Sequence, residues 1–296
     1  MKITLLRIFI RFLGFLPLPL LRALGASAGW LLYRIPNRER ENARVNLALC
    51  FPDREPGERE ALLRRSLKET ATTLLEMPAV WYGSTEKWLG RLEPGSVPDE
   101  IRDLLQQGRG LIVAMPHLGN FEISAHFFGS LGKATGLYRP PRKQGLESLM
   151  LEGRNRPGQN RMVATDRAGI KALYQALSRG EIIVILPDQQ PKSRKGGAGV
   201  FAPFFGVPAL TMTLVSRFAR KSGAPVYFIG FVRQGGSTKY RVIGQEGDPA
   251  IGGADLGRSA AALNAGVEAL VRQYPEQYQW TYRRFREQPD GSNPYG

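Results

Sequence analysis

The sequence predicts an α/β fold with a largely parallel central sheet flanked by helices, plus an N-terminal apolar, membrane-binding helical segment. From residue 110 onward, short apolar runs alternate with helical segments. Residues 1–33 are strongly apolar but interrupted by charges and prolines. The chain has 296 residues, enough for one sizeable core.

Composition narrows the class of partner. Arg and Lys number 41 against 26 Asp and Glu, which gives a formal charge of +15. Such a surface favours nucleic acid, acidic lipid headgroups or an acidic carrier protein. The single cysteine, Cys50, excludes an internal disulfide and a cysteine-based zinc site, and its apolar neighbours predict a buried side chain.

The N-terminal segment does not have the pattern of a single membrane-spanning helix. A spanning helix needs about 20 apolar residues. Residues 12–33 reach that length only by including Arg22, Pro17 and Pro19, and the prolines break any single straight helix. The same interruptions argue against a cleaved signal peptide. We expect residues 1–35 to anchor the chain at a membrane; a helix docked in the protein's own core is the alternative.

The first turns of this segment have the pattern of an interfacial helix. Arg7 and Arg11 are one helical turn apart and share a face opposite Ile3, Leu6 and Ile10. This pattern predicts a helix in the plane of the membrane interface, with its arginines toward lipid phosphates.

The elements that follow can be placed in order. Residues 35–47 form a basic, Asn-rich connector and residues 53–57 a turn. Apolar residues at helical spacing predict a helix over residues 58–77, and Pro78 is expected to end it. The expected strands are residues 110–115, 133–138, 181–186 and 225–232, and the expected later helices are residues 120–130, 168–177, 210–221 and 260–273.

Loops at the carboxyl ends of parallel strands carry the sites of such folds, and the first one holds a histidine. His117 follows the first strand, and Glu122 lies in the next element. Asn120 is a good N-cap, so a strand–loop–helix corner can bring Glu122 back to His117. A neutral imidazole can take a proton from a hydroxyl while a carboxylate on its other nitrogen fixes the tautomer. On these residues alone, a catalytic and a structural histidine both remain open.

The second histidine fits a structural role better. His126 lies four residues after Glu122, between Ala125 and Phe127, which favours packing in the core over an ion pair with Glu122. The sequence has no HExxH, so a zinc-hydrolase reading fails.

The second strand end carries Asp188 and Gln189, followed by a basic loop that includes residues 192–195. Residues 197–202 match a dinucleotide fingerprint in letters only, because no strand directly precedes them and no helix follows. Neither a G-x-S-x-G elbow nor a P-loop is present, so a serine esterase or a nucleotide hydrolase loses support. Phe201, Phe204 and Phe205 either pack in the core or line an acyl pocket or membrane contact.

Several motifs in order resemble the late acyltransferases of lipid A biosynthesis, within the lysophospholipid acyltransferase superfamily. The resemblance covers nearly the whole chain. The motifs are NLALCFP (46–52), HLGNFE (117–122), YRPP (138–141), a Gly-Arg pair (153–154), DRAGIKAL (166–173), LPDQ (186–189), VFAPFFG (200–206) and PEQYQWTYRRF (275–285).

The resemblance implies an acyl carrier protein-dependent transferase at the cytoplasmic face of the inner membrane. His117 would deprotonate the hydroxyl of a 3-hydroxyacyl chain on a lipid A precursor, and Glu122 would orient His117. Arg139 and Arg154 would meet lipid or phosphopantetheine phosphate, with Asn120 and Asp188 also near the substrate. No cofactor or metal is implied beyond the phosphopantetheine of the donor.

The resemblance also sets the domain boundaries and the alternatives. Residues 1–35 would be the membrane anchor or interfacial segment and residues 36–296 the acyltransferase domain. The family often carries histidine where Tyr282 stands, so Tyr282 is given no catalytic role, and the basic loop at residues 192–195 also departs from the pattern. The alternatives are a different phospholipid or glycolipid acceptor, or a basic non-catalytic membrane protein. No recognisable nucleic-acid module is present.

Overall fold

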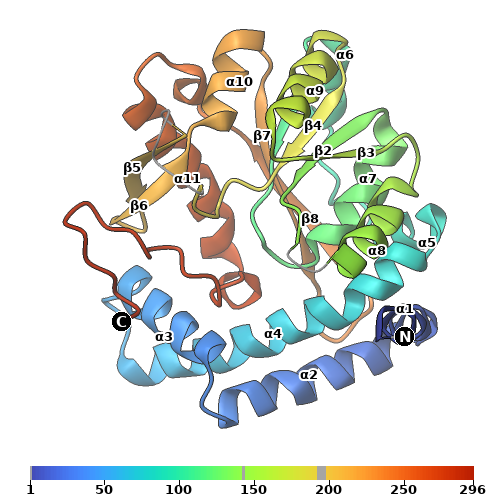
Figure 1. Cartoon of the computed structure of the whole chain (residues 1–296), viewed down its shortest axis with the longest axis vertical. Helices are drawn as coiled ribbons and strands as arrows, with labels where there is room; N and C mark the ends of the chain where they lie inside the picture. The colour runs from blue at the N-terminus through green and yellow to red at the C-terminus, as the bar shows by residue number, and fades with distance from the viewer. Residues whose placement is uncertain (1, 142–143, 192–197) are drawn as a thin grey trace.

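The computed structural model describes residues 2–141, 144–191 and 198–296. A six-stranded sheet runs through it in the order β3-β2-β4-β1-β7-β8, parallel except for the antiparallel edge strand β8 (Figure 1). The predicted α/β class with a largely parallel sheet is therefore confirmed. The strands are β1 (Leu111–Ala114), β2 (Ala134–Tyr138), β3 (Arg161–Ala164), β4 (Ile182–Ile185), β7 (Val226–Arg233) and β8 (Tyr240–Glu246).

Helices cover both faces of this sheet. The α-helices of the described residues, including those that pack on α4 and not on the sheet, are α1 (Lys2–Phe15), α2 (Leu18–Arg34), α3 (Arg38–Cys50), α4 (Pro56–Tyr82), α5 (Thr85–Leu89), α6 (Glu100–Gln106), α7 (Ser124–Leu131), α8 (Gln144–Asn155), α9 (Arg167–Ser178), α10 (Leu214–Ser222) and α11 (Leu256–Gln273). Successive strand residues point to opposite faces. Ile112 therefore packs in the core layer with α9, α10 and α11, and Val113 in the layer with α6 and α7. Burial on both faces explains why β1 and β4 read as continuous apolar runs.

A two-stranded hairpin stands beside the main sheet, made of β5 (Gly199–Phe204) and β6 (Val207–Met212). The helix expected over residues 210–221 begins only at Leu214, because residues 210–212 pair with β5. Phe205 is buried against Phe51 and Trp280, and Phe204 is buried against Phe205 and Tyr278, so for these two the core alternative is confirmed.

The expected connector at residues 35–47 is mostly the helix α3, so that prediction was wrong. Asn37 caps the helix by accepting a hydrogen bond from the backbone N–H of Arg40. The asparagines that suggested a loop bind other segments: the Asn46 amide donates to the carbonyls of Trp280 and Tyr282 at 2.6 and 2.7 Å. Cys50, at the end of α3, is buried as predicted.

Helix α4 also corrects the sequence prediction, because it continues through Pro78 to Tyr82. A helical proline removes one hydrogen bond, to the carbonyl four residues earlier, which is that of Leu74. Leu74 is 53% exposed, whereas Pro78 itself is buried. Packing of α1 and α2 along α4 supports the rest of the helix.

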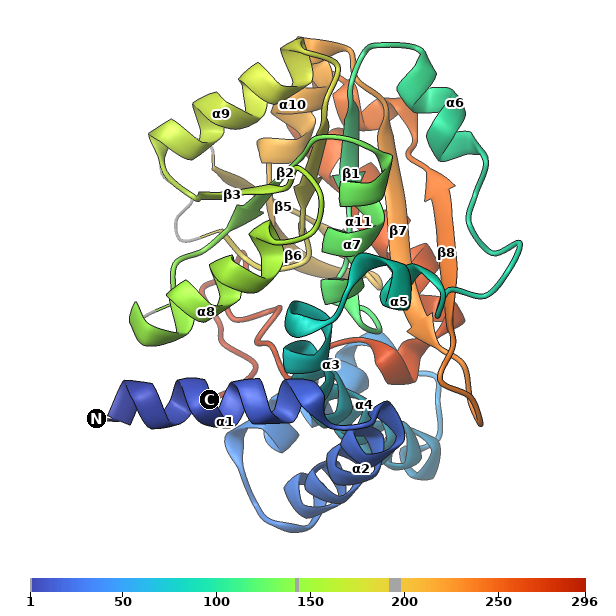
Figure 2. The same ribbon diagram turned by 90° about the vertical axis from the view of Figure 1, so that its right-hand side faces the viewer.

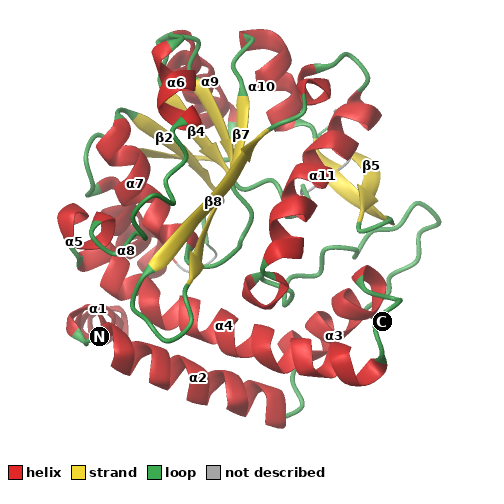
Figure 3. Cartoon of the chain, turned by 180° about the vertical axis from the view of Figure 1, so that it is seen from behind, coloured by secondary structure: helices red, strands yellow, loops and turns green. Residues whose placement is uncertain are grey.

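The N-terminal apolar segment forms two helices, as the prolines predicted. No single helix among the described residues is long and apolar enough to cross a membrane; α1 and α2 together pass in length and composition, with a bend of 119°. Figures 2 and 3 show α2 lying along α4 and α1 extending beneath α8. Close packing of α2 is possible because Gly25 and Gly29 face the α4 backbone at Thr72 and Lys68.

The exposed face of α1 differs from the predicted one. Leu5, Ile8, Phe9 and Phe12 are 56–61% exposed, and Phe15 is 82% exposed. Ile10, expected on the lipid side, is buried against the protein.

The arginines of α1 face α8. Arg7 donates to the hydroxyl of Ser148 at 2.9 Å, and Arg11 forms an ion pair with Glu152 at 3.3 Å. Membrane binding by this segment stays a prediction.

Close packing of α2 on α4 gives a direct test. A Cβ at Gly29 would lie 2.3 Å from the Cα of Lys68, so Gly29→Ala should force α2 away from α4 and cost about 1–3 kcal/mol of unfolding free energy. Gly57→Ala is the matched control, since nothing lies within 4 Å of its Cβ position. Thermal unfolding in detergent measures both; equal stability of the two variants would contradict the packing.

Candidate active site

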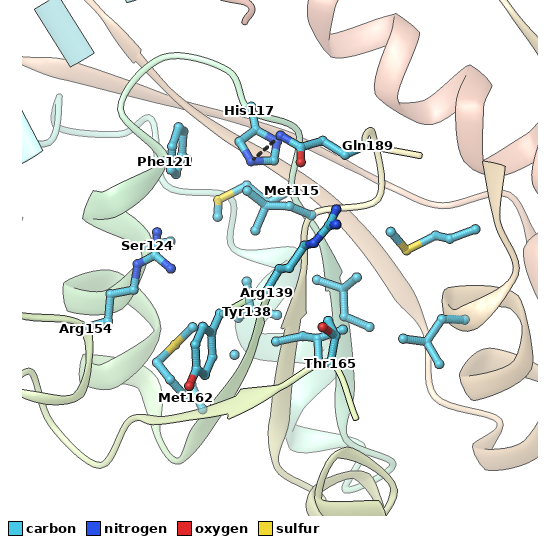
Figure 4. A pocket seen from close by; sticks show the side chains of 18 of the residues that line it. Met115, His117, Phe121, Ser124, Tyr138, Arg139, Arg154, Met162, Thr165 and Gln189 are labelled. Atoms are coloured by element: carbon cyan, nitrogen blue, oxygen red, sulfur yellow. Dashed lines mark hydrogen bonds between the residues drawn. The ribbon is translucent and has the colours of Figure 1, made fainter. Parts of the chain in front are cut away.

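The site lies where two neighbouring parallel strands end. Ala114 of β1 and Ile185 of β4 are register partners. The chain leaves β1 toward β2 on one side and leaves β4 toward β7 on the other. Such a point opens a crevice at the carboxyl edge of a parallel sheet. The loops after the two strands carry His117 and Gln189 into it (Figure 4), and Asp188 of the second loop contacts His117.

Asp188 holds His117 by two bonds. Its Oδ1 lies 2.8 Å from the imidazole Nδ1, and its Oδ2 accepts the backbone N–H of His117 at 2.9 Å. Burial raises the pKa of Asp188, but the imidazole and the backbone N–H outweigh it and hold that pKa below its usual value. An ionised carboxylate only accepts hydrogen bonds, so Nδ1 carries a proton, and in the neutral imidazole Nε2 is then the nitrogen with the lone pair.

The other side of the imidazole faces the pocket. The amide nitrogen of Gln189 lies 3.3 Å from Nε2, a long contact that another donor can replace. The Phe121 ring meets the imidazole edge-on, with 5.0 Å between centroids. The side chain of His117 is only 17% exposed. Nε2 is therefore positioned to accept a proton from a group in the pocket.

Glu122 makes its hydrogen bonds to residues other than His117, and its predicted role in orienting His117 stays a prediction. Its carboxylate accepts from Arg154 Nη2 at 2.6 Å and Nε at 2.9 Å, and from the Trp81 indole at 2.9 Å. Burial raises the pKa of Glu122, yet the Arg154 guanidinium holds it below its usual value. Asp188, not Glu122, makes the hydrogen bonds to His117, because the loop after β4 adjoins the loop after β1.

The same pair alters the expectation for Arg154. A bidentate contact with Glu122 compensates the charge that was expected to meet a phosphate. Arg154 nevertheless lines the pocket, so its remaining N–H groups belong to the site.

Asn120 occupies the N-cap position of the short 3-10 helix η1 (Phe121–Ile123), with Glu122 in its first turn, as predicted. Its side chain makes no capping bond and instead donates to Glu76 Oε2 at 2.9 Å. Asn120 is fully buried and is not among the residues that line the pocket. In this structure it supports the loop and does not face the space open to a substrate.

The pocket beside His117 has a volume of about 580 Å³. Apolar side chains from both core layers and from the strand ends form most of its wall, with polar groups at the His117 end. Shape and lining suit a long apolar chain with one reactive polar end. The apolar wall includes Met115, Phe128, Leu137, Met150, Met162, Ile170, Val184, Leu186, Met212 and Leu214.

Arg139 follows β2 and also lines the pocket, as the sequence led us to expect. Its side chain extends toward the side occupied by His117 and Gln189 (Figure 4). The predicted basic loop at residues 192–195 lies outside the described residues.

The remaining candidates have structural roles. His126 is buried, with Nε2 2.9 Å from the Val80 carbonyl and Nδ1 3.1 Å from the Thr85 hydroxyl, so its predicted packing role is confirmed. The Tyr282 hydroxyl accepts the backbone N–H of Gln190 at 3.0 Å.

Sequence reasoning missed two partners at the site. Trp81 on α4 bonds to Glu122 across a separation of 41 residues, and no local pattern could indicate it. Gln189 was noticed after its strand but was not assigned to His117. Its position directly after Asp188, in a second strand-end loop, was the available signal.

Comparisons with known proteins show the family of the chain. The family model described as bacterial lipid A biosynthesis acyltransferase matches residues 2–287. The chain is 31% identical over 281 residues to the lipid A biosynthesis lauroyltransferase of Escherichia coli (strain K12), covering 93% of this chain and 88% of that protein. It is 30% identical over 285 residues to the palmitoleoyltransferase of the same strain (94% and 89%) and 25% identical over 279 residues to its myristoyltransferase (94% and 83%).

The Asp188 carboxylate gives a pH-dependent prediction. Its pKa in the folded protein is held below its usual value, so its ionised form stabilises the fold at neutral pH, and the contribution is lost as the pH falls through the folded pKa. Asp188→Asn should lower the unfolding free energy by about 1–3 kcal/mol at pH 7, with a smaller difference near pH 3. Urea titrations at several pH values measure this, with exposed Asp99→Asn as control. A pH-independent difference would contradict the assignment.

Proposed function

The chain belongs to the bacterial lipid A biosynthesis acyltransferase family and is an acyltransferase, and on this premise we propose its donor, acceptor and mechanism. The donor is an acyl chain on acyl carrier protein. The acceptor is the hydroxyl of a 3-hydroxyacyl chain on a lipid A precursor. His117 is the general base, and Asp188 takes the orienting role that the sequence suggested for Glu122.

One observation carries the mechanism: His117 is fixed by Asp188 through Nδ1 and presents Nε2 at one end of a pocket with largely apolar walls. The acyl chain of the donor fits the apolar part, which places its thioester carbonyl near Nε2. A carboxylate on Nδ1 steadies the imidazolium that forms when Nε2 takes a proton.

The acyl group is then transferred directly from the donor thioester to the acceptor hydroxyl. The acceptor hydroxyl gives its proton to Nε2 as its oxygen attacks the thioester carbonyl. The new C–O ester bond forms, the C–S bond breaks, and the imidazolium returns the proton to the departing thiolate of phosphopantetheine. His117 ends in its starting state, and no covalent acyl-enzyme is needed.

The Glu122–Arg154 pair gives the second polar element. Glu122, which also accepts from the Trp81 indole, fixes the Arg154 guanidinium at the pocket wall, and the uncommitted N–H groups of Arg154 donate to the carbonyl oxygen as negative charge develops. This preserves a role for Glu122 in the reaction that acts through Arg154.

The formal charge of +15 and Arg139 support the choice of partners. Arg139 at the pocket wall suits a phosphate of phosphopantetheine or of the lipid. An acidic carrier protein and a phosphorylated lipid both benefit from a basic surface.

The apolar face of α1 and α2 supports attachment in the plane of the inner membrane, on its cytoplasmic side. Both helices are docked on the body of the protein, and their outward side chains form an apolar surface. Its members are Leu5, Ile8, Phe9, Phe12, Phe15, Leu20, Leu24, Trp30, Leu31 and Ile35, each 43–82% exposed.

The reaction can be tested by mass spectrometry of a lipid A precursor incubated with the enzyme and acyl-acyl carrier proteins of different chain length. We expect a mass gain of one acyl chain, and His117→Ala should lose at least about a hundredfold in rate because it removes the base. Its melting temperature controls for folding. Near-native turnover by the folded variant would refute the mechanism; no gain with any donor would point to another lipid acceptor.

Membrane attachment can be tested by vesicle flotation. Phe12→Asp with Phe15→Asp places two charges on the apolar face of α1 and should lower binding to anionic vesicles at least about tenfold. Gln106→Asp with Gln107→Asp adds the same charge at exposed positions next to α6 and serves as control. Equal loss in both variants would show that net charge, not the apolar face, determines binding.

A further inference from the structure

A second group of buried charges lies behind the catalytic loop, outside the pocket. Glu76 on α4 is fully buried and binds side chains from three other segments. Arg22 Nε donates to Oε1 at 2.8 Å, Arg233 donates to Oε2 at 2.8–2.9 Å, and Asn120 donates to Oε2 at 2.9 Å. We call these three side chains, Arg22, Arg233 and Asn120, the arms of the cluster. Each comes from a distant part of the sequence, and all three meet at Glu76.

The first arm connects Glu76 to the N-terminal helix pair. Arg22 lies on α2, and its side chain is 18% exposed. It also donates to the carbonyl of Ser237 and stacks over the Tyr240 ring at 5.1 Å. Burial lowers the pKa of Arg22, but Tyr240 and Glu76 outweigh it, and its pKa is raised. α2 is therefore attached to the body by an ion pair as well as by apolar packing.

The second arm keeps the cluster neutral. Arg233, at the end of β7, pairs with Glu76 and, at 3.2 Å, with Glu69. Its backbone N–H and C=O both bond to the Gln277 side chain at 2.8 and 3.0 Å. Two arginines thus face two carboxylates, and their mutual attraction offsets the desolvation cost of burying the charges.

The third arm reaches the catalytic loop. Asn120 lies three residues after His117, and its backbone N–H donates to the Phe231 carbonyl at 2.8 Å. Gly119 lies so close to β7 that a Cβ would be 2.0 Å from the Phe231 oxygen. Thr73 of α4 contacts the Gly119 carbonyl at 3.0 Å. The loop is thus fixed on the side opposite the pocket by α4 and β7.

We propose that Glu76 is a positioning residue that joins helix α2, through Arg22, to the catalytic loop, through Asn120. The inference rests on the proposed function only in taking His117 as the base. Asp188 fixes the ring of His117, and Glu76 fixes the backbone after it, so the position of Nε2 depends on both. A displacement of α2 at the membrane changes the loop through this cluster.

The coupling can be separated from folding by variants at its two ends. Arg22→Gln removes the α2 arm and leaves Glu76 paired with Arg233. Asn120→Ala removes the loop arm and leaves both arginines paired. Arg34→Gln is the matched control, since Arg34 lies on the same helix, is exposed, and stacks only on Trp30 of its own helix among the described contacts.

We expect Arg22→Gln and Asn120→Ala each to lower kcat roughly 3- to 30-fold, with KM for the acyl donor within about twofold of wild type. The fold-loss in kcat of the double variant should be smaller than the product of the two single-variant losses, because both substitutions act through Glu76. Arg34→Gln should keep the wild-type kcat.

Hydrogen exchange of the peptide spanning residues 117–122 gives a readout that needs no activity. Exchange there should be faster in Arg22→Gln than in wild type and Arg34→Gln. Wild-type exchange with Arg22→Gln, or fully multiplicative losses in kcat, would overturn the proposal. An inactive wild type would overturn the proposed function instead, while the exchange experiment would still decide the coupling. If Arg22→Gln does not fold, Asn120→Ala alone must show the loss in kcat at unchanged KM.

Discussion

The hydrogen bonds between His117 and Asp188 are the interaction on which the rest of the site depends. They exist because β1 and β4 are neighbours in register, with Ala114 opposite Ile185, so that the loops after both strands enter the same crevice. The apolar pocket opens at that same edge, since the strand ends and the helices on both faces form its walls. A site built from two strand ends is rigid where the chemistry needs a fixed ring.

Three buried carboxylates surround the loop that carries His117, and each is compensated differently. Asp188 faces the imidazole, Glu122 faces Arg154, and Glu76 faces two arginines. Removing one partner of a buried pair leaves an unpaired charge, which costs more than the pair contributes. This constraint ties α2, α4, α8 and β7 to one short loop, so that the charges stabilise a particular arrangement of elements more than the fold as a whole.

Much of the fold could be predicted from the sequence, and less of the site. Continuous apolar runs indicated β1 and β4, and Pro17 indicated the break between α1 and α2. Pro78 and the asparagines of α3 misled, because tertiary packing supports a helix where local propensity does not. The partners within the site were also not predicted, because they come from distant parts of the sequence. His117 was found from its loop, but its partner lies 71 residues away, and local spacing pointed to Glu122.

The most direct measurement is a crystal structure of the protein with a non-hydrolysable acyl thioester analogue. The account predicts the acyl chain in the pocket beside Met115 and Met162, with the carbonyl next to His117 Nε2 and its oxygen facing Arg154. It also predicts that the Asp188 contact with Nδ1 is unchanged. An acyl chain bound elsewhere, or a carbonyl out of reach of Nε2 with the pocket empty, would contradict it.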